Sequence, residues 1–179
     1  MISLTKLDVA RRQLRTALEL WFADGDPVSI HALVYAAHEI IHRLYRNNGG
    51  KDLLFDTSVI KDEHRSEFAK LLKEDANFFK HPDKDLHETR KFNPLVNDLF
   101  LIMSTIGIQR MGETGDVESA FMFWLYLHHP SWFPKDAAKE RIPVERLNKM
   151  RSLNKHEFLQ SFLAAMEDKR RHGVGITGG

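Results

Sequence analysis

The sequence has no cysteine among its 179 residues. This absence excludes a disulfide framework, a thiol nucleophile and every zinc or iron–sulfur site with cysteine ligands, so a metal site would need histidine and carboxylate ligands. Residues 1–15 carry scattered charges and lack the apolar core of a signal peptide. No apolar run approaches the roughly 18 residues that a membrane-spanning helix needs. We therefore expect a cytoplasmic protein with no membrane partner.

The sequence also lacks an excess of charge of either sign. Lys and Arg total 26 and Asp and Glu total 25, which gives a formal net charge of +1. No overall field therefore draws the protein to nucleic acid or to an anionic membrane, and any nucleic-acid surface must be local. Residues 135–172 form the one basic region, with ten Lys or Arg and six Asp or Glu.

Apolar residues recur at helical spacing through most of the chain, and no alternating β pattern is long enough to matter. The expected helices cover residues 1–23, 27–46, 59–79, 95–111, 116–128 and a last segment that follows Asn154. We therefore expect an all-α fold, an up-and-down bundle of five or six helices. The length fits a single domain over residues 1–172, followed by a flexible C-terminal tail at residues 173–179.

Three pairs of residues predict where helices begin. Asp26 before Pro27, and Asn93 before Pro94, combine a side chain that can accept hydrogen bonds from free N–H groups with a proline suited to the first helical turn. Asn154 and Glu157 have the spacing of a capping box.

The regions between and around these helices carry two further signals. Residues 81–92 show no clear period, and a connector of about a dozen residues is long for a compact domain, which favours a functional or mobile segment. The helix at residues 116–128 is rich in aromatic side chains, which belong either in the core or at the face of a homodimer.

Residues 38–42 read His-Glu-Ile-Ile-His, the HExxH arrangement of zinc hydrolases. Two imidazoles one helical turn apart can bind zinc, and the glutamate can activate a water molecule. A catalytic site needs a third protein ligand, for which Glu63 lies at a credible distance downstream. This pattern predicts a zinc cofactor on His38, His42 and Glu63 as one alternative.

The same helix carries a polar-aromatic stripe at spacings of four, three, four and three residues. Its members are His31, Tyr35, His38, His42 and Tyr45. Such a stripe is typical of a half-buried face whose rings pack against a neighbouring helix or a second subunit. We favour this interpretation over metal binding, and we also keep His31, His38 and His42 as candidate binding residues.

A second candidate site follows the third expected helix. Asn77, Lys80 and His81 lie within five residues of one another, next to the long polar connector. Histidine can donate and accept a proton near neutral pH, so we take His81, Asn77 and Lys80 as candidate catalytic residues that need no cofactor. Candidate binding residues in the connector are Asp83, His87 and Arg90.

Asn77 and His81 resemble the end of the RNxxxH motif of HEPN proteins, a family of small all-α bundles that often dimerise and include many RNases. The resemblance implies a homodimer whose two motifs meet at a cleft, and metal-independent RNA cleavage. In that family the histidine and arginine act on the 2′-hydroxyl and the scissile phosphate, and the asparagine orients the site. Asn77 and His81 would take the asparagine and histidine roles.

The motif departs from the family at one position, because Ala76 stands where the family has arginine. The guanidinium that would stabilise the charged transition state is therefore missing, and Lys73, Lys80 or Arg90 would have to replace it. We expect an RNA- or nucleotide-binding HEPN-like protein with degenerate or metal-independent RNase activity. The alternatives are the zinc hydrolase and a non-enzymatic oligomeric interaction protein.

Overall fold

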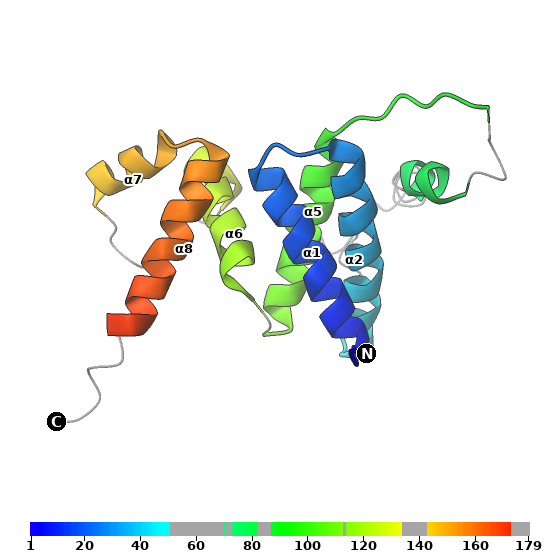
Figure 1. The fold of residues 1–179 in the computed structure, drawn as a ribbon, viewed down its shortest axis with the longest axis horizontal. Coiled ribbons are helices and arrows are strands. Elements are labelled where there is room, and N and C mark those ends of the chain that lie inside the picture. Colours follow the sequence, from blue (N-terminus) through cyan, green and yellow to red (C-terminus); the bar gives the residue numbers. More distant parts are fainter. Residues whose placement is uncertain (51–69, 71–72, 82–86, 113, 134–142, 173–179) are drawn as a thin grey trace. The chain divides into compact units, whose positions relative to one another are not determined.

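The computed structural model describes residues 1–50, 70, 73–81, 87–112, 114–133 and 143–172. Every regular element in these ranges is helical, which confirms the all-α class (Figure 1). The elements are α1 (Lys6–Phe22), α2 (Pro27–Asn47), α5 (Leu95–Arg110), α6 (Asp116–His128), η1 (Pro130–Trp132), α7 (Val144–Arg151) and α8 (Lys155–His172). Residues 73–80 add a short helical segment. Over the same ranges, no helix has the length and apolar character needed to cross a membrane.

The predicted helix starts are confirmed by their hydrogen bonds. The Ser29 amide donates to the Asp26 carboxylate at 2.7 Å, and Pro27 opens α2. The Leu95 amide donates to the Asn93 side chain at 3.2 Å. Asn154 and Glu157 form the reciprocal capping box, with bonds of 2.9 and 3.1 Å. Local sequence alone therefore determines these three starts.

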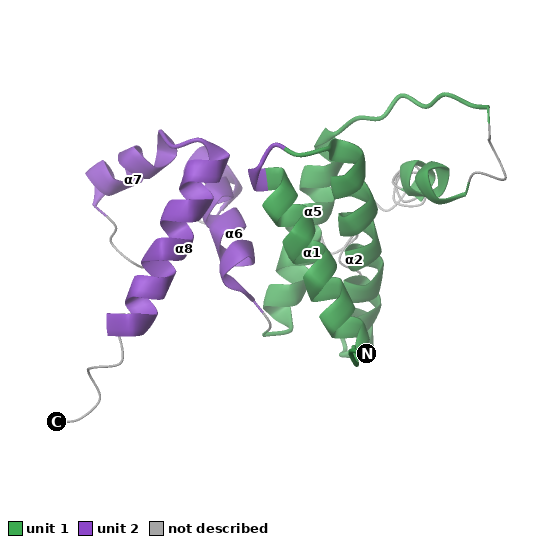
Figure 2. Ribbon diagram, in the orientation of Figure 1, with its two compact units in different colours: residues 1–21, 25–113 green, residues 22–24, 114–179 purple. Residues whose placement is uncertain are grey.

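The contacts within the chain group it into two compact units (Figure 2). Unit 1 comprises Met1–Trp21 and Gly25–Glu113, and unit 2 comprises Phe22–Asp24 and Thr114–Gly179. The grouping into two units does not test whether residues 1–172 form a single domain, so this expectation stays a prediction. The expected tail at residues 173–179 lies outside the described residues.

Unit 1 is built on α1, α2 and α5. α1 and α2 run in opposite directions, and α5 runs parallel to α2 (Figure 1). Two hydrogen bonds fix the parallel register, because His31 pairs with Asn97 near the start of the two helices and Arg110 donates to Tyr45 near their ends. The Trp21 indole donates to Asp98 at 2.7 Å, which ties the end of α1 to the start of α5.

The core of unit 1 follows the apolar stripes of these helices. α5 is apolar on most of its surface, and its first residue, Leu95, is nevertheless 71% exposed. The fully or almost fully buried apolar side chains of unit 1 include Leu14, Leu18, Val34, Ile41, Phe100, Leu101 and Ile108. Burial of these side chains is the main source of the stability of unit 1.

Unit 2 has an aromatic core between α6 and α8. The Phe158 ring of α8 packs against Trp124 of α6 at 5.1 Å, and Phe121 is fully buried. Phe22 stacks on Phe158 at 6.2 Å. The aromatic side chains of α6 therefore build the core, and the homodimer face suggested for them stays a prediction.

Two helical segments, α7 and residues 73–80, differ from what the sequence predicted. The sequence did not predict α7, which is only eight residues long and shows three apolar residues, Val144, Leu147 and Met150, none of them fully buried. Of the helix expected at residues 59–79, the described part is helical at residue 70 and at residues 73–80, and the rest lies outside the described ranges. Its fully buried side chain is Ala76, whereas the expected inward residues Asp75, Phe78 and Phe79 are half-buried.

Candidate functional site

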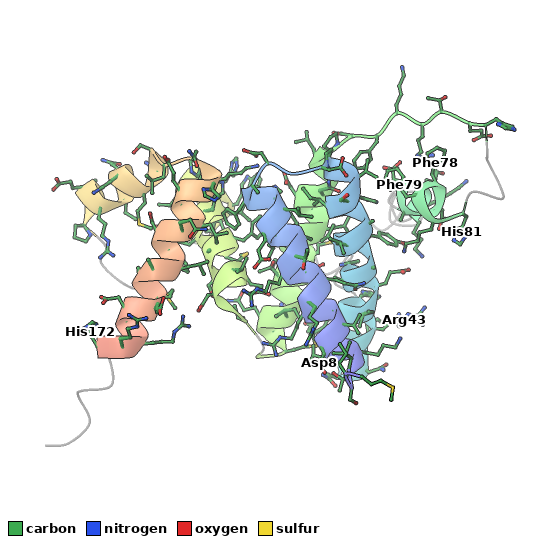
Figure 3. The ribbon with its side chains drawn as sticks, viewed as in Figure 1. Asp8, Arg43, Phe78, Phe79, His81 and His172 are labelled. Carbon is green, nitrogen blue, oxygen red and sulfur yellow. The ribbon has the colours of Figure 1, made fainter. Side chains whose placement is uncertain are left out.

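The segment of residues 73–81 packs on the first half of α2 through Phe79 (Figure 3). The Phe79 ring meets the His31 ring edge-on at 5.4 Å and the Phe92 ring at 5.3 Å. This contact brings the sequence candidates of the segment next to those of α2. Ala76, which is 1% exposed, also faces the interior.

Lys80 also contacts α2. Its ammonium lies 4.8 Å from the centre of the Tyr35 ring and 4.0 Å from the Glu39 carboxylate. Burial, together with the nearby Glu39, raises the pKa of Tyr35 to about 12. The phenol therefore stays protonated at neutral pH and can donate its hydrogen bond to Glu39. Because Lys80 and Glu39 are both substantially exposed, their ion pair adds little stability, and its role is to fix the position of Lys80.

Asn77 and His81 lie one helical turn apart, and both are exposed. The His81 amide donates to the Asn77 carbonyl at 3.0 Å, which completes the last turn of the segment. Together with Lys80, these residues form an exposed set that we call the Asn77–His81 face. The structure thus brings together the three candidate catalytic residues that the sequence indicated.

Arg90 lies beside this face, but its charge is already engaged. Its guanidinium donates to the Asp75 carboxylate and, at 3.1 Å, to Glu74. The hydrogen bond to Asp75, followed by that to Glu74, raises the pKa of Arg90. Glu74 and Asp75 immediately precede Ala76, the position where the motif would have its arginine. Two carboxylates therefore already pair with the Arg90 guanidinium.

His31 is a core residue of α2, with no exposed surface. Its Nδ1 lies 2.9 Å from the Asn97 side-chain oxygen, and the Asn97 amide nitrogen donates to the Pro27 carbonyl at 2.9 Å. Since the Asn97 oxygen can only accept, Nδ1 of His31 must carry the proton. Burial lowers the pKa of His31.

His38 is also buried, with 7% of its surface exposed. Its ring meets Phe100 at 5.2 Å and lies 5.9 Å from the His42 ring. Burial and, second, the proximity of His42 lower the pKa of His38 to about 4. The structure confirms that the polar-aromatic stripe packs against α5, so His31 and His38 are not accessible to a ligand at the surface.

The residues of the zinc alternative are divided between two environments. His38 faces α5, whereas Glu39 is exposed and faces Lys80 and Tyr35. Within the part of the chain that the structure describes, no three His, Asp or Glu side chains are grouped as metal ligands. Glu63 lies outside that part, so the zinc site stays a prediction. Asp83 also lies outside it, and His87 is exposed.

The sequence patterns include Tyr35, Glu39 and Lys80 but do not predict that these three side chains lie together. Tyr35 belonged to the stripe, Glu39 to the HExxH pattern and Lys80 to the Asn77–His81 set. The available signal was geometric, because Tyr35 and Glu39 are four residues apart on one helix and therefore share a face. Only the packing of Phe79 brings Lys80 to that face.

Replacing Asn97 with alanine should destabilise unit 1 by about 1–3 kcal/mol, because the buried His31 N–H would lose its acceptor. Urea unfolding at pH 7 measures this change. Asn77→Ala is the matched control, since Asn77 is exposed and should change stability by less than about 0.5 kcal/mol. Equal effects of the two substitutions would contradict the assignment of the His31 proton.

We compared the chain with models of known protein families, with curated proteins and with solved structures. No match was found in any of the three comparisons.

Proposed function

We propose that this chain is a HEPN-like RNA- or nucleotide-binding protein whose ligand contacts the Asn77–His81 face without a metal. The observation that carries the proposal is the shared exposure of an amide, an ammonium and an imidazole on one short helical segment that Phe79 and Lys80 hold against α2. These three groups can all hydrogen-bond to phosphate oxygens, because Lys80 lies 4.0 Å from Glu39, beyond hydrogen-bond distance, whereas Arg90 already donates to two carboxylates.

The state of Arg90 favours binding over cleavage. Cleavage of a phosphodiester builds negative charge on the phosphate, which an unengaged guanidinium would stabilise. Arg90 already donates to Asp75 and Glu74, and Ala76 supplies no charge. We therefore expect degenerate RNase activity, with the protein acting mainly as a binding module.

The proposal includes a cytoplasmic homodimer, in which the Asn77–His81 faces of two copies meet around one ligand. The basis for the dimer is the HEPN resemblance. Size-exclusion chromatography with light scattering tests this part, and a strictly monomeric protein that binds RNA with full affinity would contradict it.

RNA binding should depend on the Asn77–His81 face. We expect Lys80→Ala to weaken the binding of a fluorescein-labelled single-stranded ten-nucleotide RNA several-fold and to reduce the salt dependence by about one ion, because one phosphate contact is lost. Adding Asn77→Ala or His81→Ala to the Lys80→Ala variant should weaken RNA binding further. Fluorescence anisotropy across a series of salt concentrations measures these effects.

The matched control is Lys91→Ala, which removes an exposed lysine outside the segment of residues 73–81. It should leave affinity within about twofold. If the triple variant of Asn77, Lys80 and His81 binds RNA as the unmodified protein does, the ligand does not contact this face and the proposal fails.

A further inference from the structure

A second group of side chains with binding chemistry lies in unit 2, at the C-terminal end of α6. We call His128, His129, Trp132 and Arg151 the α6 terminal cluster. These residues come from α6, from η1 and its preceding residue, and from the end of α7. None of these residues belongs to the Asn77–His81 face.

The cluster contains two imidazole–indole stacks. The His129 and Trp132 rings are 4.2 Å apart and nearly parallel, with an interplanar angle of 11°. The His128 ring stacks on Trp124 at 4.0 Å. Trp124 belongs to the aromatic core, whereas Trp132 is 61% exposed and His129 is also exposed. The outer stack is therefore a flat aromatic surface held open to solvent.

Trp132 is the one aromatic residue among the large apolar side chains that are exposed in the described ranges. The chain fixes it in place nonetheless. The Trp132 amide donates to the His129 carbonyl at 3.0 Å, and the His129 amide donates to the Leu125 carbonyl at 2.7 Å. These bonds set the backbone of the turn that begins at Pro130, and the stacking of the two rings orients the side chains, which lowers the ordering that a stacking ligand would require.

Arg151 supplies a positive charge at the same end of α6. Its Nε donates to the Leu127 carbonyl at 2.9 Å, and its proximity helps to lower the pKa of His128, after burial. The Leu127 bond uses one guanidinium nitrogen, and within the part of the chain that the structure describes no hydrogen bond or ion pair engages the two terminal nitrogens. The same bond offsets the negative end of the helix dipole, which would otherwise repel an anion.

The surroundings of the cluster are basic. α7 exposes Arg146 and Lys149 one turn apart and has a single acidic residue, Glu145. Residues 144–172 contain seven Lys or Arg and four Asp or Glu. An exposed aromatic ring on η1 and exposed cations on α7, two elements that both contact α6, match the bases and phosphates of a single strand.

We propose that the α6 terminal cluster binds single-stranded RNA, with a nucleobase stacked on Trp132 and a phosphate of the same strand held by the terminal nitrogens of Arg151. The exposed cations of α7 then contact neighbouring phosphates. The His129–Trp132 stack determines where a base binds, and the Arg151 guanidinium determines where the RNA backbone binds. Since stacking needs only a π-face, the site has little preference among bases.

The experiment uses the full chain and a fluorescein-labelled ten-nucleotide oligoadenylate. Trp132→Ala should weaken binding roughly tenfold, and Trp132→Phe should retain most of the affinity because the ring is kept. Arg151→Gln should lower the salt slope by about one ion while its amide can still donate to the Leu127 carbonyl. Unlabelled oligoadenylate should quench tryptophan emission in the unmodified protein and less so in Trp132→Phe.

The matched control is Arg171→Ala, which removes a charge already paired with Glu167 on α8 and should change affinity less than twofold. Unchanged binding by both Trp132→Ala and Arg151→Gln would overturn the proposal. So would Trp132-dependent binding of polyglutamate with the same affinity, which would indicate an acidic protein partner. A loss in these variants but not in the Asn77, Lys80 and His81 variants would support this site and reject the Asn77–His81 face.

Discussion

Replacing Phe100 with alanine is expected to destabilise unit 1 by about 3–5 kcal/mol, a large fraction of the stability of a small unit. Phe100 is 1% exposed, and its ring contacts the rings of His31, Tyr35 and His38 at 5.2–5.7 Å. The substitution removes the apolar wall against which the stripe of α2 packs. Urea unfolding followed by far-ultraviolet circular dichroism measures the loss.

Leu95→Ala is the control for Phe100→Ala on the same helix. Leu95 is 71% exposed, so its truncation should cost less than about 0.5 kcal/mol. A loss below about 1 kcal/mol for Phe100→Ala would mean that the α2 stripe does not pack on α5 as the structure shows.

Lowering the pH from 7 to 4 is expected to remove about 3 kcal/mol of stability through His38 alone. The pKa of His38 falls to about 4 in the folded protein, whereas the unfolded chain has the ordinary value near 6.5. The unfolded state therefore binds a proton first, and stability is lost progressively as the pH falls through this window. His31 adds to the loss with the same sign, because burial lowers its pKa as well.

The variant His38→Leu separates this effect from the titration of carboxylates. Leucine has a similar volume and suits a site beside Phe100, and it does not titrate. The difference in unfolding free energy between the unmodified protein and the variant should change by about 3 kcal/mol between pH 7 and pH 4. Measurements with a chelator present keep metal binding out of the comparison. A difference independent of pH would show that His38 is not buried in its neutral form.

The two faces of α2 have different tasks. Its inner face places His31 and His38 in the core, where they are neutral and pack with aromatic rings. Its exposed face carries Glu39, which pairs with Lys80, and the buried Tyr35 links the two faces because its ring contacts both Phe100 and the Lys80 ammonium. Because Phe79 packs on the buried His31 and directly precedes Lys80 in the chain, damage to the core should also displace the Asn77–His81 face. The Phe100→Ala variant should therefore lose RNA affinity along with stability.

Local sequence determined the helices and their starts. The Asp26 cap, the Asn154–Glu157 box and the segment Asp116–His128 were predicted correctly, because capping and helical spacing depend on neighbours within one or two turns. The polar-aromatic stripe was predicted for the same reason, since residues four and three apart share a helix face.

Tertiary structure alone decided the chemistry of the candidate sites. The sequence could offer Arg90 as a substitute for the missing arginine, but only the fold brings Glu74 and Asp75 to its guanidinium. Likewise, only the fold sets Arg151 at the end of α6, 24 positions from Leu127 along the chain. The physical reason is that charge and burial depend on distances in space, and residues far apart in sequence acquire those distances only when the helices pack.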